Sequence, residues 1–177
     1  MSEEFDLDSV IRRIPDFPKP GVLFYDITSI MMNPGAFTKV LDIMVEIYQK
    51  KAIDAVAAVE SRGFIFGAPL AERLQIPLIL VRKSGKLPGD TIKRSYKLEY
   101  GEAEIEIHNS DIPAGKNVLV VDDLLATGGT LKAAADLLVE GGAVVKDVFS
   151  VIGLPFLNYA EHLKDYEITT LINYDSE

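Results

Sequence analysis

The residue types best suited to chemistry lie in one segment, Val118 to Thr130, with the sequence VLVVDDLLATGGT. Val118 to Val121 is apolar and rich in β-branched residues, which is typical of a strand buried on both faces of a parallel sheet. The turn Ala126 to Thr130 precedes a helical pattern, so its N–H groups and hydroxyls predict an anion site at a helix N-terminus. Asp122 and Asp123 would stand at the carboxyl end of the strand, where open α/β sheets bind ligands. A phosphate on the turn and a diol on the carboxylates together describe a ribose 5-phosphate site.

Two commoner phosphate-binding sequences are missing from the chain, namely G-x-x-x-x-G-K-[ST] and a G-x-G-x-x-G turn after a strand. Gly85-Lys86 is followed by Leu87, so it does not form a P-loop. The alternative for the Ala126 to Thr130 turn is an ordinary strand-to-helix connection. That alternative would leave two adjacent carboxylates facing solvent without a purpose.

Length and composition restrict the class of protein. The 177 residues suffice for one well-buried domain, and the 48% hydrophobic content indicates a globular chain. A formal net charge of −9 argues against nucleic acid as a partner. The chain has no cysteine and only two histidines, and no signal-peptide core or membrane-spanning run is present. We therefore expect a cytoplasmic protein without a membrane partner.

Apolar periodicity predicts the elements that position the chemical segment. Asn33 as N-cap and Pro34 at the first helical position would begin a helix that runs to about Lys50. Strands alternating with helices indicate an α/β fold with a mostly parallel sheet. The predicted helices are Leu7 to Ile14, Asn33 to Lys50, Phe64 to Leu74, Leu131 to Val139 and Leu157 to Leu163; the predicted strands are Ala55 to Val59, Leu78 to Val81, Val118 to Val121, Val144 to Ile152 and Ile168 to Ile172.

The middle of the chain combines a basic loop with a hairpin. Arg82 to Arg94 is polar and holds five basic residues, which predicts a long cationic loop. Tyr96 to Tyr100 and Ala103 to His108 both alternate between polar and apolar residues, which indicates an antiparallel hairpin around Gly101-Glu102.

Several segments in the same order resemble the type I phosphoribosyltransferase family. VLVVDDLLATGGT is similar to the family's phosphoribosyl-diphosphate motif. The other matching segments are Ile14 to Ile27, Glu60 to Gly67, Arg82 to Gly89 and Leu98 to Gly101. The resemblance implies one domain over residues 1–177, with a base-binding hood at 1–33. It also implies a core at 34–177 that carries a mobile loop at about 83–101.

The resemblance also implies an activity. The Leu124-Leu125-Ala126 variant is similar to the members that act on adenine. Such an enzyme transfers a 5-phosphoribosyl group from phosphoribosyl diphosphate to N9 of adenine, giving AMP and diphosphate in purine salvage. Mg²⁺ would be held through the substrate's diphosphate and ribose oxygens rather than by a protein cage. A C₂ homodimer is expected, in which the residue matching Arg82 reaches across the interface.

Roles follow for individual residues from the pattern and the resemblance together. The Glu60–Ser61 peptide bond is expected to be cis, as in related enzymes. Ribose and 5-phosphate are assigned to Asp122, Asp123, Ala126, Thr127, Gly128, Gly129 and Thr130; diphosphate to Glu60, Ser61, Arg62, Gly63, Arg82, Lys83 and Lys86; the base to Val22, Leu23, Phe24, Tyr25 and Leu124.

Glu99 matches the family's general acid/base, which would exchange a proton near N7 of adenine. Its alternative is an exposed hairpin glutamate such as Glu102. Tyr100 would help to close the loop over the site. Tyr25 departs from the pattern, because many family members carry arginine there, and this departure bears on adenine selectivity.

Two other functions stay open at this point. A relative acting on hypoxanthine, guanine or xanthine would share the sugar-phosphate motif. A purine-sensing regulator could use the same fold to bind phosphoribosyl diphosphate without catalysis, although the acidic chain disfavours the nucleic-acid surface that it would need.

Overall fold

A computed structural model of the protein describes residues 6–97 and 101–176. Within these residues the centre is a seven-stranded sheet in the order β5-β6-β4-β3-β7-β8-β9. Five neighbouring strands, β4, β3, β7, β8 and β9, run parallel to one another. β6 pairs antiparallel with both β4 and β5. The strands are β1 (Arg12–Pro15), β2 (Leu23–Asp26), β3 (Ala55–Val59), β4 (Leu78–Lys83), β5 (Thr91–Lys97), β6 (Glu102–His108), β7 (Val118–Leu125), β8 (Asp147–Gly153) and β9 (Glu167–Asn173).

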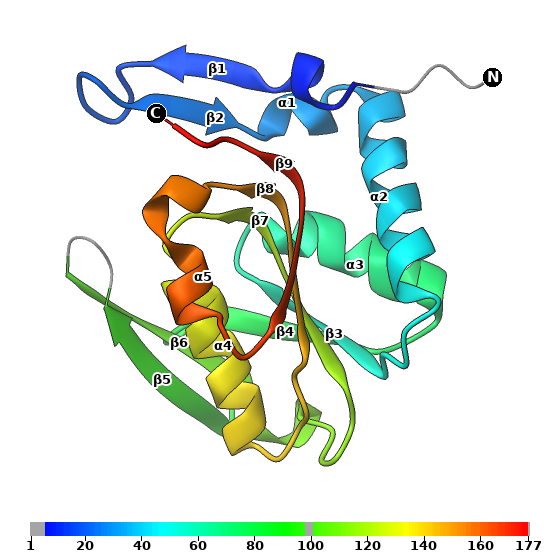
Figure 1. Ribbon diagram of the computed structural model, residues 1–177. Coiled ribbons are helices and arrows are strands. Elements are labelled where there is room, and N and C mark those ends of the chain that lie inside the picture. The colour runs from blue at the N-terminus through cyan, green and yellow to red at the C-terminus, as the bar shows by residue number, and fades with distance from the viewer. Residues whose placement is uncertain (1–5, 98–100, 177) are drawn as a thin grey trace.

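Helices cover both faces of the sheet (Figure 1). Alternate residues of β3 point to opposite sides, so Ala57 joins the core beneath α4, whereas Val56 joins the core beneath α2 and α3. The predicted mostly parallel α/β fold is therefore confirmed. The helices are α1 (Thr28–Met31), α2 (Pro34–Tyr48), α3 (Gly63–Leu74), α4 (Gly129–Glu140) and α5 (Tyr159–His162), with 3-10 turns at Asp8–Val10, Asn109–Asp111 and Pro155–Leu157.

The start of α2 follows the predicted capping chemistry. The Asn33 side chain accepts a hydrogen bond from the Ala36 N–H at 3.1 Å, and Pro34 is the first helical residue. No helix among the described residues is long and apolar enough to cross a membrane.

The N-terminal region differs from the prediction. Leu7 to Ile14 does not form a helix, because only Asp8–Val10 makes a 3-10 turn and β1 follows at Arg12. β1 pairs antiparallel with β2, so that Arg13 lies opposite Tyr25. Pro15 disfavours helical geometry in the residue before it, and pairing with β2 outweighs the weak propensity of so short a helix. The 3-10 turn, this hairpin and α1 together form the hood, which lies across the end of the sheet (Figure 1).

The predicted basic loop is shorter than expected. Arg82 and Lys83 still belong to β4, and β5 begins at Thr91, so only the residues from 84 to 90 connect the two strands. The predicted antiparallel pairing is confirmed for Tyr96 and Lys97 and extends upstream to Thr91, which pairs with His108, while residues 98–100 of the predicted strand lie outside the described residues. The polar side chains of β5 concealed its strand character, because this edge strand has one solvent-facing side.

Candidate active site

The carboxyl ends of β3, β4 and β7 border a pocket of about 640 Å³. This volume is in the range usual for small-molecule sites. All three strands run parallel, so their following turns meet at one edge of the sheet. Described residues that line the pocket are Val59, Glu60, Ser61, Arg62, Lys83, Ser84, Tyr96, Ala103, Glu104, Asp122, Asp123, Leu124 and Thr130.

The turn after β3 lies directly against β7. The Glu60–Ser61 peptide bond is cis, as predicted. A Cβ atom on Gly63 would stand 2.9 Å from the Val121 carbonyl oxygen and 3.1 Å from Asp122 Oδ1, so only glycine permits this approach. α3 begins at Gly63. The N–H groups of Phe64 and Ile65 donate to the Ser61 and Arg62 carbonyls, so the donors left at this helix start are the N–H groups of the residues before them. The turn can therefore offer donors to an anion beside the Asp122 carboxylate.

An ion pair crosses the pocket from this turn to β7. Arg62 Nε donates to Asp123 Oδ2 at 2.5 Å, and the Asp123 side chain is only 6% exposed. The Asp123 N–H donates to Asp122 Oδ1 at 2.8 Å. Burial, and next the negative charge of Asp123, raise the pKa of Asp122 well above its usual range. Two close carboxylates sharing one guanidinium make a site that favours a cation or hydroxyl donors.

A second ion pair ties β4 to the same turn. Glu60 accepts hydrogen bonds from Arg82 Nε at 3.1 Å and from the Lys83 N–H at 3.0 Å. The hydrogen bond from Arg82 is the largest effect, and it holds the pKa of Glu60 below its usual range despite partial burial. Lys83 lines the pocket, while Lys86 is exposed and Arg82 also donates to the Lys86 carbonyl at 3.3 Å. The diphosphate roles assigned to these cations stay predictions.

The turn after β7 has the geometry of an anion cradle. Gly128 has a φ of 85°, a left-handed conformation that favours glycine, and α4 begins at Gly129. The N–H groups of the first helical turn are free of intrahelical bonds, and the positive end of the helix dipole adds to them. Thr130, in the first turn of α4, lines the pocket. The 5-phosphate role predicted for this turn stays a prediction.

The hairpin contributes pocket residues that the sequence motifs did not reveal. Tyr96 on β5 pairs with Ala103 on β6, and Glu104 follows. The Thr130 hydroxyl donates to Tyr96 Oη at 3.3 Å, so β5 reaches the predicted phosphate turn. The alternation of polar and apolar residues could have assigned Tyr96 and Glu104 each to one face of the hairpin. It does not show which of the two faces lies toward β7.

Glu106 on β6 is a further residue with a clear structural task. It is 1% exposed and accepts hydrogen bonds from the N–H groups of Lys86 at 2.7 Å and Leu87 at 2.8 Å. Lys93 Nζ lies 3.4 Å from its carboxylate. Burial alone would raise the pKa of Glu106, but these N–H groups, that of Gly85 and Lys93 together lower it to about 2. An ionised carboxylate thus holds the 84–90 connection in place.

The predicted base-binding residues lie in two places. Leu124 lines the pocket, whereas Val22, Leu23 and Phe24 are half-buried in or beside β2 in the hood. The Phe24 ring meets that of Phe17 edge-on, with centroids 5.0 Å apart. The side chain of Tyr25 is buried against Tyr174.

The predicted catalytic residue Glu99 and loop residue Tyr100 lie outside the described residues. Across residues 6–97 and 101–176, no group of three or more histidine, aspartate or glutamate side chains could hold a metal ion. Asp122 and Asp123 alone offer fewer oxygens than Mg²⁺ takes, so a bound ion would need ligand oxygens or water as well. The donor set therefore fits an ion that arrives with an oxygen-rich substrate.

Comparisons with known proteins agree with this geometry. Residues 26–152 match the model of the phosphoribosyl transferase domain family. The adenine phosphoribosyltransferase of Treponema denticola is 58% identical over 97% of this chain and 90% of the relative. The crystal structure of adenine phosphoribosyltransferase from Thermoanaerobacter pseudethanolicus has a TM-score of 0.90, with 42% identity over 96% of this chain and 100% of the other. That of the Saccharomyces cerevisiae enzyme, complexed with an imino-altritol bisphosphate and adenine, has a TM-score of 0.87, with 40% identity over 93% and 96% of the two chains.

Proposed function

The chain belongs to the phosphoribosyl transferase domain family, and from this membership and its pocket we propose that it transfers a 5-phosphoribosyl group to N9 of adenine. The donor is phosphoribosyl diphosphate, and the products are AMP and diphosphate. One observation carries the proposal: the carboxylates of Asp122 and Asp123 stand between two turns whose N–H groups can bind anions. Relatives that cover nearly the whole chain are named for this activity.

The residues divide the reaction between them. The bond from ribose C1 to the diphosphate oxygen breaks with its electron pair on the oxygen, and a bond from N9 of adenine to C1 forms. The positive charge that develops on the ribose ring faces Asp122 and Asp123, which stabilise it. The N–H groups after β3, together with Lys83, receive the departing negative charge. Glu99 accepts the proton that adenine loses.

Magnesium dependence, a homodimer and a cytoplasmic location are further parts of the proposal. Mg²⁺ would be held through substrate oxygens, with Asp122 and Asp123 meeting the ribose hydroxyls beside it, and it would neutralise charge on the diphosphate. The resemblance supports the dimer, in which Arg82 would leave Glu60 and reach the neighbouring site. Chelation should abolish turnover and added Mg²⁺ should restore it, and sedimentation should give a mass twice that of the chain. Subcellular fractionation should recover the activity with the cytoplasmic contents.

The decisive experiment is steady-state turnover of adenine, hypoxanthine, guanine and xanthine with phosphoribosyl diphosphate and Mg²⁺. We expect adenine to be converted to AMP with a kcat/KM at least about 100-fold above the other bases, since a site that hydrogen-bonds one base edge leaves polar groups unpaired with another. Faster turnover of hypoxanthine would assign the chain to another base. Binding of phosphoribosyl diphosphate without turnover of any base would favour the regulator.

A further inference from the structure

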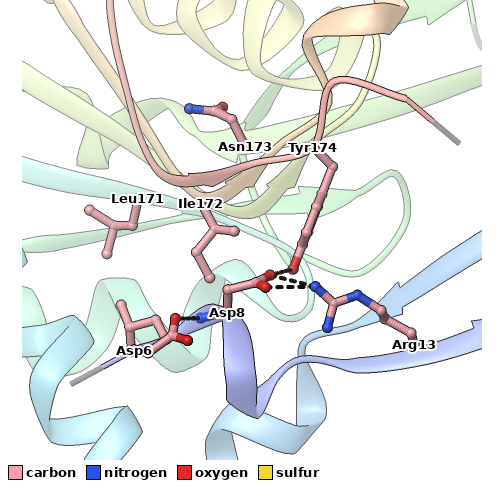
Figure 2. A pocket seen from close by; sticks show the side chains of 8 residues that line it. Asp6, Asp8, Arg13, Leu171, Ile172, Asn173 and Tyr174 are labelled. Atoms are coloured by element: carbon pink, nitrogen blue, oxygen red, sulfur yellow. Dashed lines mark hydrogen bonds and ion pairs between the residues drawn. The ribbon is translucent and has the colours of Figure 1, made fainter.

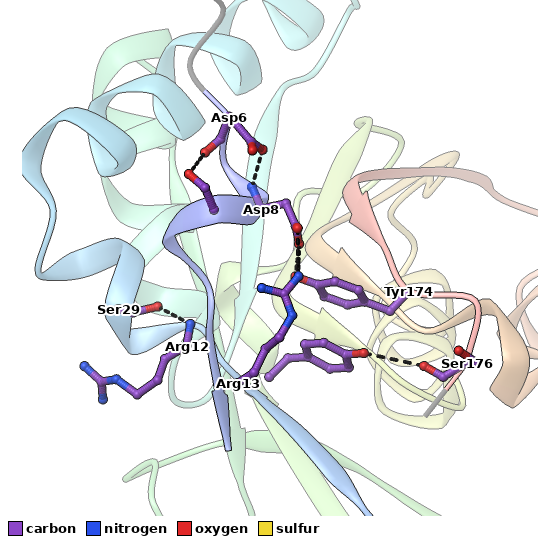
Figure 3. A network of polar contacts seen from close by, with 9 residues as sticks. Asp6, Asp8, Arg12, Arg13, Ser29, Tyr174 and Ser176 are labelled. Atoms are coloured by element: carbon purple, nitrogen blue, oxygen red, sulfur yellow. Dashed lines mark hydrogen bonds and ion pairs between the residues drawn. The ribbon is translucent and has the colours of Figure 1, made fainter. Parts of the chain in front are cut away.

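Tyr174, just beyond β9, contacts residues of the N-terminal hood. Its ring stacks on Tyr25 with centroids 3.6 Å apart and planes 6° apart. Its hydroxyl donates to Asp8 Oδ1 at 2.6 Å. Arg13 Nη2 donates to both Asp8 oxygens at 2.7 Å, and its guanidinium lies 5.5 Å from the Tyr174 ring centroid. Figure 3 shows Asp8, Arg13 and Tyr174 converging. Tyr174 thus contacts three hood residues, Asp8, Arg13 and Tyr25, and we call these four residues the clasp.

The clasp stands beside a hollow rather than inside continuous packing. A pocket of about 740 Å³ adjoins it, with Asp8 and Arg13 on the hood side and Tyr174 on the other (Figure 2). Across this hollow Tyr174 extends from the end of β9 to the hood. Buried apolar residues of the hood, among them Ile11 and Ile27, pack in one core cluster with Ile172 of β9, and beside the hollow Tyr174 adds one aromatic ring and its hydroxyl to this contact.

The clasp is one residue away from the predicted base slot. Tyr25 and Phe24 are neighbours on β2, and successive side chains of a strand point to opposite faces. With Tyr25 fixed against Tyr174, Phe24 faces away from the clasp, toward the side where its ring meets Phe17. A shift or roll of β2 would move Phe24 while leaving the ends of β3 and β7 in place.

We propose that Tyr174 is a positioning residue for base binding, because its stack on Tyr25 and its bond to Asp8 fix β2 and with it Phe24. This inference rests on the proposed function for its kinetic readout. Tyr174 acts through Tyr25 and does not touch the substrate. Asp8 stays ionised at neutral pH, since the Tyr174 hydroxyl and then Arg13 hold its pKa below the usual range.

Graded substitutions of Tyr174 test the proposal. Tyr174→Ala removes ring and hydroxyl, and we expect it to raise the KM for adenine about 10-fold while the KM for phosphoribosyl diphosphate changes less than about twofold. Tyr174→Phe keeps the ring, so the KM for adenine should rise only about 3-fold. Tyr166→Phe is the matched control, because it removes a hydroxyl that donates to the Asp136 carboxylate at 3.3 Å away from the hood. It should leave both KM values unchanged.

Hydrogen exchange separates this proposal from the proposed function. Tyr174→Ala should speed exchange in residues 12–26 and not in 118–130. Equal increases in both KM values, or unchanged exchange in the hood, would overturn the positioning role. If the wild type fails to convert adenine, the proposed function falls, and exchange alone decides whether the clasp holds the hood. Should Tyr174→Ala fail to fold, Tyr174→Phe and Asp8→Asn give the same comparison.

Discussion

The sugar-phosphate side of the pocket and the hood are held by different kinds of contact. On the first side, ion pairs join residues at the ends of neighbouring parallel strands: Arg62 pairs with Asp123, and Arg82 pairs with Glu60. The hood is a two-stranded hairpin, and at the edge of the sheet Tyr174 fixes it through a ring stack and a hydroxyl. Backbone ladders therefore set the geometry of one side, whereas side chains from distant parts of the chain set that of the other.

This difference predicts how each side responds to substitution. Charge changes on the sugar-phosphate side should alter the chemical step with little change in shape, because buried strands on either side fix the backbone. Changes in the hood should alter base binding by moving a whole segment. A substitution in the hood that altered the chemical step, or one on the sugar-phosphate side that altered base binding, would contradict this difference between the two sides.

The largest effect should come from Asp123→Asn. The substitution keeps the shape but removes a carboxylate that faces the developing positive charge, and it leaves Arg62 without its partner. We expect kcat/KM for phosphoribosyl diphosphate to fall about 100-fold or more, as for loss of a preorganised electrostatic group. Steady-state kinetics with varied donor measure this, and the exposed Asp111→Asn serves as control. A fall of less than about threefold would remove Asp123 from the reacting centre.

Glu99→Ala should reduce kcat by about 100-fold with little change in AMP affinity, because it removes a proton acceptor rather than a binding contact. Single-turnover kinetics and calorimetric titration of AMP measure the two quantities. Glu102→Ala is the control, because Glu102 is an exposed glutamate nearby in the sequence. Wild-type turnover in Glu99→Ala would leave base activation to another group and would weaken the family-based assignment.

The same comparison explains what the sequence could reveal. The Val118 to Thr130 side was predictable because strand, carboxylates and turn are contiguous, and the order of the motifs placed Glu60 to Gly63 beside them. The arrangement of the hood was not predictable. Tyr174, which stacks on Tyr25, lies more than a hundred residues away in the sequence, and Asp8, which pairs with Arg13, lies in a segment with weak helical periodicity. Glu106 was missed for a related reason: its partners are backbone N–H groups, which carry no sequence signal.

Glu106→Gln should loosen the connection that carries Lys86. The folded pKa of about 2 lies below the unfolded value, so the ionised carboxylate stabilises the fold above about pH 4.5. That contribution, on the order of 3 kcal/mol at neutral pH, is lost as pH falls toward the folded pKa. Urea unfolding at pH 6 and pH 3 should therefore show a smaller loss of stability on acidification in the variant than in the wild type. Because Asp8 and Glu60 also have lowered pKa values, the difference between the two proteins, not either slope alone, isolates Glu106.

Tyr96→Phe should give the smallest change in kinetics, and it tests whether Tyr96 belongs to the sugar-phosphate side or to the base side. Its hydroxyl meets Thr130 at 3.3 Å, so it belongs to the sugar-phosphate side even though it comes from the hairpin. Loss of one neutral hydrogen bond should raise the KM for phosphoribosyl diphosphate about 2- to 5-fold and leave the KM for adenine unchanged. Thr130→Val removes the other hydroxyl, and if the two act through the same contact, the double variant should be no worse than the more damaging single one. Additive losses would mean that each hydroxyl reaches the substrate separately, and a change in the KM for adenine would tie the hairpin to the base side instead.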